Sequence, residues 1–187
     1  AGVKDIFLEI ENGRVGNIKV NMGSPEFKAE KIPVKIKNLD EVFNYKINVD
    51  SKKFYLNCVS IGNPHCVIFL EKNENLKNFP VSKWGPVLEN HDIFPHKINV
   101  EFIKIKSNSR NKQLDMRVWE RGAGETLACG TGACAAGICA FKLKKIKCSK
   151  VTINLPGGKL NVLWDIDNSN VYLEGKVSYK FDGLYFL

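Results

Sequence analysis

Short apolar or alternating runs, separated by turn residues, make up most of the chain. Residues 4–10 and 17–22 alternate on either side of Asn12 and Gly13, a pattern typical of a β-hairpin. Further strands are predicted at residues 33–36, 45–49, 54–62, 63–71, 96–107, 113–122, 150–166 and 170–181, where residues 150–166 form a hairpin that turns at residues 156–158. The chain is therefore predicted to consist mainly of β-structure.

Two helices interrupt this β-pattern. Residues 81–94 fit a helix with apolar residues on one face and Ser82 as its N-cap. Residues 132–145 are rich in alanine and follow a glycine-rich turn, which predicts a second helix that packs closely through Gly132 and Gly137. The fold class predicted from these elements is α/β, in the form of an α+β fold.

The net charge of +8 comes mainly from lysine and changes this picture little. The lysines are scattered apart from a cluster in residues 142–147, at the end of the second predicted helix, where cations complement the helix dipole. We interpret the cluster as a solvated helix end, because a nucleic-acid surface usually interleaves arginine with aromatic residues. No apolar run approaches the roughly 20 residues that span a bilayer. Neither a nucleic acid nor a membrane is therefore expected as a partner.

The six cysteines do not form a recognisable metal-binding pattern, because the chain contains no C-x-x-C pair. Cys129, Cys134 and Cys139 are five residues apart, so on a helix each lies well off the face of the one before it. No metal site is predicted. No signal peptide is recognised, and reduced thiols in a cytoplasmic protein are the better expectation for this number of cysteines.

The glycine-rich turn places Cys129 where a strand ends and a helix begins. The free N–H groups at a helix start favour negative charge, which predicts a thiol pKa lowered from about 8.5 toward neutrality. The N–H groups of Gly130, Thr131 and Gly132 can also bind a carboxylate. In the alternative interpretation Cys129 is a small buried residue and the glycines only shape a turn. Residues 130–135 match the dinucleotide-binding pattern G-x-G-x-x-A, but the acidic residue expected about 20 positions further on is absent, which argues against a Rossmann site. A P-loop is excluded because no G-K-[ST] sequence follows.

Two other stretches carry polar residues in unusual places. Asn63 and Pro64 mark a sharp turn directly before His65, which makes His65 a candidate proton partner or orienting residue. Asn99 falls inside a predicted strand, where asparagine is disfavoured. Taken alone, His65 fits a structural role better than a catalytic one, and Asn99 could equally face solvent.

Taken together, three stretches resemble the diaminopimelate epimerase family. They are G-N-P-H at residues 62–65, I-N-V-x-F at residues 98–102, and W-E-R-G-A-G-E-T-x-A-C-G-T-G-A-C-A-A at residues 119–136. The sequences LPGGKLNVLW at residues 155–164 and FDG at residues 181–183 also look like that family. The long motif is highly specific. The resemblance covers the whole chain but only the latter part of the family's usual length.

This resemblance implies an isomerase that converts LL-diaminopimelate to the meso isomer in lysine and peptidoglycan biosynthesis, without a metal or pyridoxal phosphate. It implies two cysteines on opposite faces of the α-carbon, one acting as thiolate base and the other as thiol acid. Cys129 matches the second cysteine, and His65 and Glu120 would tune it. The residues implied to bind substrate are Asn63, Asn99, Glu120 and Arg121 at the distal amino-carboxylate end, and Gly130 and Thr131 at the α-carboxylate.

The resemblance also implies a fold of two similar halves with the site between them. Residues 1–22 would finish the first half, residues 23–176 would form a C-terminal half with a mixed sheet wrapped around a central helix, and residues 177–187 would return to the first half as a strand. The family's first cysteine lies in an N-terminal motif close to N-G-x-R-C, which is absent here. The chain is therefore expected to be a fragment that is inactive alone, completed by the missing N-terminal half in a homodimer.

Two other functions remain open from the sequence. A proline-racemase-type isomerase also uses a C-G-T-G turn, but it lacks the W-E-R-G-A-G-E-T stretch that precedes the turn here. The chain could also be a non-catalytic half that binds a ligand or a partner chain.

Overall fold

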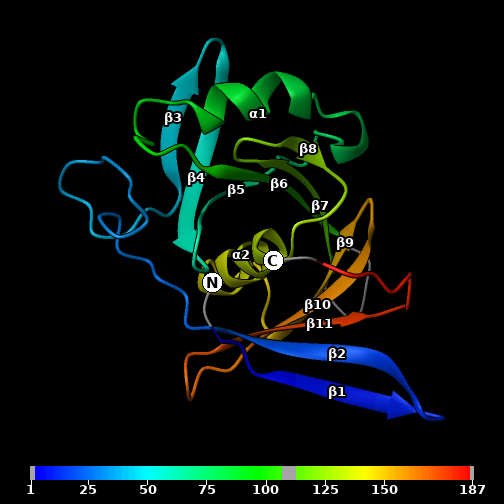
Figure 1. The fold of residues 1–187 in the computed structure, drawn as a ribbon. Coiled ribbons are helices and arrows are strands. Elements are labelled where there is room, and N and C mark those ends of the chain that lie inside the picture. The colour runs from blue at the N-terminus through cyan, green and yellow to red at the C-terminus, as the bar shows by residue number, and fades with distance from the viewer. Residues whose placement is uncertain (1–2, 107–112, 186–187) are drawn as a thin grey trace.

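The computed structural model describes residues 3–106 and 113–185 of the chain (Figure 1). The strands in this part are β1 (Ile6–Glu11), β2 (Arg14–Gly23), β3 (Tyr45–Val49), β4 (Lys52–Ser60), β5 (Pro64–Phe69), β6 (Asn99–Lys106), β7 (Gln113–Glu120), β8 (Gly124–Thr126), β9 (Lys150–Leu155), β10 (Gly158–Trp164) and β11 (Val171–Lys176). The helices described are a short 3-10 helix η1 (Leu76–Asn78), α1 (Val81–Glu89) and α2 (Gly130–Lys142). The predicted α+β class, dominated by strands, is confirmed.

The described strands join into one mixed sheet. Their order is β1-β2-β11-β10-β9-β7-β6-β5-β4-β3, and β8 pairs with β7. The pairs β5–β6 and β7–β9 are parallel, and the other pairs are antiparallel. The sheet curves so that α2 lies inside it, with β4 to β7 on one side and β9 to β11 on the other (Figure 1). This arrangement agrees with the mixed sheet around a central helix that the family resemblance implies.

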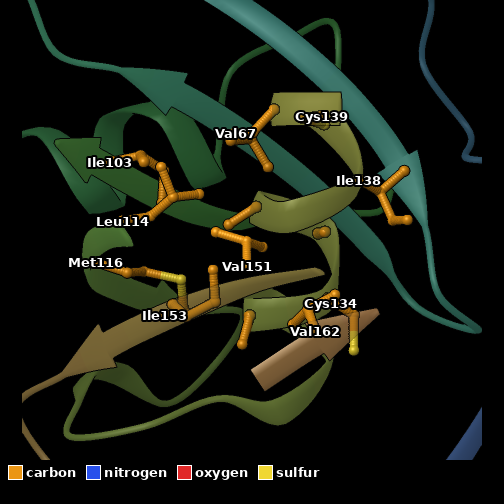
Figure 2. Close-up of a cluster of buried hydrophobic side chains, with 14 of the residues drawn as sticks. Val67, Ile103, Leu114, Met116, Cys134, Ile138, Cys139, Val151, Ile153 and Val162 are labelled. Carbon is orange, nitrogen blue, oxygen red and sulfur yellow. The ribbon is translucent and has the colours of Figure 1, made fainter. Parts of the chain in front are cut away.

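The composition of α2 explains its central place. Every residue from 132 to 140 is buried, so the helix is apolar on all sides, as expected of a helix inside a core. Figure 2 shows Cys134, Ile138 and Cys139 of α2 among side chains from the surrounding strands. Gly137 lets the helix approach β10, because a Cβ there would lie 2.9 Å from Cγ1 of Val162. The prediction of close packing through the helix glycines is confirmed at this position.

A second core lies on the opposite face of β4 to β6, beneath α1. Val100 and Phe102 of β6 belong to this core, whereas Ile103 belongs to the core around α2. Because side chains alternate along a strand, Asn99 and Glu101 share the α2 face with Ile103. Asn99 and Glu101 therefore point toward the central helix.

Several sequence predictions differ from the structure in detail. Residues 33–36 form no strand, because Pro33 has no N–H and the N–H groups of Val34 and Lys35 bond to Ala29 and Ile93 outside any strand ladder. The helix predicted at residues 81–94 ends at Glu89, since the side chain of Asn90 bonds back to the carbonyl of Pro86 at 2.8 Å.

The N-cap prediction for this helix is also wrong. The helix begins at Val81 after Pro80, which makes no side-chain cap, and Ser82 lies inside the first turn. At the C-terminal end, residues 177–185 carry no strand, although a strand was expected there. The predicted strand at residues 96–107 extends by one residue beyond the described part of the chain. The domain boundaries proposed after residues 22 and 176 remain predictions. They lie at the ends of β2 and β11, which pair directly with each other.

The strand β1 forms one edge of the described sheet and carries a row of exposed apolar side chains. Ile6, Phe7, Leu8 and Ile10 are each more than half exposed. An unpaired strand edge of this kind can pair with another chain segment. In the described part of the chain, no helix is long and apolar enough to cross a membrane.

Candidate active site

Cys129 occupies the N-cap of the central helix. Its backbone is extended, with φ −138° and ψ 115°, and its carbonyl accepts the first helical hydrogen bond from Ala133 at 2.9 Å. The Sγ atom accepts from the N–H of Gly132 at 3.4 Å and lies 3.5 Å from Oγ1 of Thr131. The N–H groups of Gly130 and Thr131, in the first turn, have no partner inside a helix. The thiol and the proposed carboxylate cradle therefore share one helix end.

The ends of β5 and β6 bring two of the sequence-predicted residues together. These strands are parallel, and His65 lies opposite Asn99 in their register. Both side chains are buried. Nδ2 of Asn99 donates to the carbonyl of Pro64 at 2.8 Å, and Oδ1 of Asn99 accepts from the N–H of Arg121 at 2.9 Å. Asn99 thus faces the interior rather than solvent, and it joins the turn before His65 to the turn that carries Arg121.

His65 is held on both sides of its ring. Nδ1 lies 2.7 Å from Oε1 of Glu101, and Nε2 lies 3.0 Å from Oδ1 of Asn63. Because an ionised carboxylate only accepts hydrogen bonds, Nδ1 donates to Glu101. The amide oxygen of Asn63 also only accepts, so the contact at Nε2 requires either a proton on Nε2 or the opposite orientation of the Asn63 amide group. Glu101 is not among the site residues predicted from the sequence, and its signal was a charged residue on the inward face of a buried strand, two positions after Asn99.

Glu120 and Arg121 stand at the end of β7, where the chain turns toward β8. Oγ1 of Thr126 donates to the carboxylate of Glu120, which orients this side chain within the hairpin. Arg121 is exposed, and its Nη1 donates to the carbonyl of His96 at 3.1 Å. The structure therefore places Glu120 near enough to influence Cys129 electrostatically. The side chain of Arg121, next to it, is accessible to solvent.

A second residue that the sequence analysis missed supports this turn. Glu89, the last residue of α1, is buried and accepts from Nε1 of Trp119 at 2.7 Å and from the N–H of Gly122 at 2.9 Å. Helix α1 comes close enough for these bonds because residue 85 is glycine, where a Cβ would lie 2.5 Å from the Trp119 ring. Glu89 and Asn99 together hold the turn that bears Arg121.

The acidity that helix position predicted for Cys129 is wrong in direction. Burial, the largest effect, raises the pKa of Cys129 to about 11, and the negative charges of Glu101 and Glu120 raise it as well. The hydrogen bonds from Thr131 and from the N–H of Gly132 lower the pKa but are outweighed. Only 7% of Cys129 is exposed, so a thiolate there would lose most of its hydration.

The buried thiols predict that the chain loses stability in alkali. Burial raises the pKa of Cys129 to about 11 and of Cys134 to about 12, and it raises the pKa of Cys66 and Cys139 well above the ordinary range. The unfolded chain releases these protons at about pH 8.5. The folded state therefore binds more protons above that pH, and its free energy of unfolding should fall as the pH rises toward the folded-state values.

Urea unfolding from about pH 8 to about pH 11 measures this slope. The variant Cys134→Ala should make the fall shallower, because it removes one buried thiol, whereas the exposed thiol in Cys148→Ala provides the matched control. An identical slope for Cys134→Ala and the parent chain would contradict the assignment.

Among residues 3–106 and 113–185, no group of three or more histidine, cysteine, aspartate or glutamate side chains is placed to hold a metal ion. The paired contacts of His65, Glu101 and Asn63 described above are bonds within the protein.

Comparison with known proteins identifies the family. The sequence profile of the diaminopimelate epimerase family matches residues 57–180, which include the GNPH turn, both glutamates beside Cys129 and the turn at Cys129 itself. The chain belongs to the diaminopimelate epimerase family. All the site residues predicted from sequence lie inside the matched region.

Curated diaminopimelate epimerases agree with this assignment. The protein of Halothermothrix orenii is 47% identical over 92% of this chain and 58% of its own length. Those of Desulfitobacterium hafniense and Acetivibrio thermocellus are 44% and 42% identical, over 98% of this chain and 62% of their own lengths. The chain therefore spans about three fifths of the diaminopimelate epimerases that it matches.

Solved structures show that the fold is shared more widely. A hydroxyproline epimerase from Agrobacterium vitis superposes with a TM-score of 0.65 at 12% identity, covering 92% of this chain and 53% of the other. A probable proline racemase from Agrobacterium radiobacter K84 has the same TM-score at 11% identity, covering 95% and 57%. At such low identity these likenesses concern the fold alone.

Proposed function

We propose that this chain supplies the Cys129 half of a diaminopimelate epimerase, an isomerase that inverts the α-carbon between the LL and meso forms. The observation that carries the proposal is the placement of Cys129 at the N-cap of α2, next to the N–H groups of Gly130 and Thr131. In a chain of this family, that geometry suits a thiol that faces an α-carbon whose carboxylate is bound at the helix start.

In the proposed reaction Cys129 exchanges a proton with one face of the α-carbon. A second thiol, from protein outside this chain, exchanges a proton with the other face. When a thiolate on one face takes the α-proton, the thiol on the opposite face gives its own, so charge and proton count balance. Exclusion of water and correct placement of both sulfurs are required, because the α-proton is very weakly acidic.

The proposed binding residues divide between the two ends of the substrate. Arg121, at the rim, would pair with the distal carboxylate through its planar fork, beside Glu120. Asn63 and Asn99 already use amide atoms within the protein, so each would offer the substrate only its remaining N–H capacity. Their first task in the proposal is to hold the turns in place.

The exposed apolar row on β1 supports a partner segment. It suits the N-terminal half that the family resemblance implies, which would also bring the second thiol. A homodimer and a cytoplasmic location belong to the same proposal and rest on the resemblance. No metal or pyridoxal phosphate takes part in the proposed reaction.

The test is to incubate LL-diaminopimelate with the chain in D₂O, first alone and then with a segment that supplies the N-terminal part of a relative. Chiral chromatography measures inversion, and mass spectrometry measures deuterium at the α-carbon. We expect no inversion by the chain alone and inversion with deuterium incorporation when the segment is added, because one thiol reaches only one face.

Three other outcomes would overturn the proposal in different ways. Inversion by the chain alone at enzymatic rates would show that the second thiol lies within it. Racemisation of proline in place of diaminopimelate would favour the proline-racemase type. Tight ligand binding without exchange, in the completed protein, would favour a non-catalytic half.

A further inference from the structure

Glu101 is a buried carboxyl group to which the proposed reaction gives no task. It lies in β6, its exposed fraction is 0%, and Oε1 contacts Nδ1 of His65 at 2.7 Å. Its other oxygen, Oε2, is buried and has no hydrogen-bond partner among the described residues. An unpaired buried oxygen destabilises the folded chain, so a purely structural role explains this side chain poorly.

The carboxyl group also abuts the first turn of α2. A Cβ on Gly132 would lie 2.8 Å from Oε1 of Glu101 and 3.3 Å from Sγ of Cys129. The absence of a side chain at residue 132 therefore lets both groups approach the same helix end. The N-terminus of a helix carries partial positive charge, which helps to stabilise a buried carboxylate there.

We propose that Glu101 is a positioning residue of this site, which orients the ring of His65 and places a buried negative charge beside the Cys129 thiol. It touches neither the substrate nor the reacting carbon in this proposal. It acts through its two neighbours, His65 on β5 and Cys129 at the start of α2.

Its action on His65 follows from the hydrogen bonds. Because Glu101 accepts at Nδ1, a proton is fixed on that nitrogen, and Nε2 is turned toward the amide group of Asn63. The ring is thus held between β6 and the turn before Pro64. Without the Glu101 carboxylate, no group on β6 would fix the proton on Nδ1 or the rotation of the His65 ring.

Its action on Cys129 follows from charge. A nearby like charge disfavours the ionised form of a thiol, and Glu101 contributes in this way to the raised pKa of Cys129, Cys66 and Cys139. The other charged group that acts on Cys129 is Glu120, and Cys129 in turn raises the pKa of the neighbouring thiol Cys134 in α2. At neutral pH Cys129 is therefore kept as the thiol, the form that gives a proton.

The test measures thiol chemistry in the 187-residue chain without substrate. The rate of iodoacetamide alkylation at Cys129, mapped by mass spectrometry, is followed against pH for the parent chain and for Glu101→Gln. The variant keeps an oxygen facing His65 but removes the charge. We expect the midpoint for Cys129 to move to lower pH, which makes alkylation below the midpoint about tenfold faster.

Glu41→Gln is the matched control. Glu41 pairs with Lys142 at the opposite end of α2, so this variant removes a carboxylate of the same charge that also lies next to α2, but at a distant, exposed place. Its Cys129 profile should stay unchanged because exposed charges at that distance are screened. An unchanged midpoint in Glu101→Gln, or an equal shift in both variants, would overturn the proposal.

A second measurement does not depend on the folding of Glu101→Gln. Nitrogen-15 NMR of the parent chain reports which ring nitrogen of His65 carries the proton, with the signals of the other two histidines assigned through His91→Gln and His96→Gln. We expect a proton on Nδ1, and an unprotonated Nδ1 would overturn the proposal.

This inference rests on the proposed function only for the use made of the thiol. Neither measurement involves diaminopimelate, so a chain that fails to support epimerisation could still show the alkylation shift and the His65 tautomer. The converse result, epimerisation without either effect, would remove Glu101 from the site and leave the proposed reaction intact.

Discussion

Replacement of Cys129 by alanine should abolish inversion of the α-carbon of diaminopimelate, together with proton exchange on the face that Cys129 serves. Cys129 is the thiol at the N-cap of α2, next to the proposed carboxylate cradle. A positioned acid or base contributes about 10²–10⁴ to the rate of proton transfer, so the loss in the completed protein should be at least of that order. Deuterium incorporation into diaminopimelate measures it directly.

The control for this prediction is Cys148→Ala, which removes an exposed thiol after the end of α2. Its exchange rate should match that of the parent protein. Cys129→Ala should also bind the substrate, because the N–H groups of Gly130 and Thr131 remain in place. Undiminished inversion in Cys129→Ala would assign the proton transfer to another group.

Replacement of Ile138 by alanine should cost about 2–5 kcal/mol of the free energy of unfolding, the range for large-to-small changes in a close-packed core. Ile138 lies in the middle of α2 and is completely buried between the two sides of the curved sheet (Figure 2). The cavity left behind cannot close, because strands pack against the helix on both sides. Urea unfolding monitored by circular dichroism measures the change.

Ile166→Ala is the matched control, with the same atoms removed from an isoleucine that is 72% exposed. Its free energy of unfolding should change by no more than about 0.5 kcal/mol. Equal effects of the two substitutions would mean that α2 is not the centre of the core.

Local patterns were sufficient to locate most elements of this fold. Both predicted hairpins form, with Asn12 and Gly13 at positive φ in the first turn and Gly158 at positive φ in the second. The alanine-rich segment forms the central helix because no charged residue interrupts its apolar surface from residue 132 to residue 140. Residues 33–36 misled the prediction, since their apolar residues pack into a core from irregular backbone.

For the candidate site too, part was determined by the sequence and part only by the structure. The sequence alone determined which residues stand at the helix start and at the strand ends. The long motif around Cys129 and the GNPH turn are each an unbroken stretch of sequence, so both can be recognised without the fold. The structure brings His65, Asn99 and Asn63 into one hydrogen-bonded group next to that helix start. Their roles toward substrate remain predictions.

What only the tertiary structure decided is the environment of the thiol. The helix start, taken alone, indicates an acidic cysteine, and the folded chain raises the pKa of Cys129 instead. Two features from distant sequence cause the reversal, namely burial under the surrounding sheet and the carboxylate of Glu101, 28 residues before Cys129. Desolvation and buried charge depend on what packs around a group. No local pattern contains that information, whereas the helix position of Cys129 is a local property.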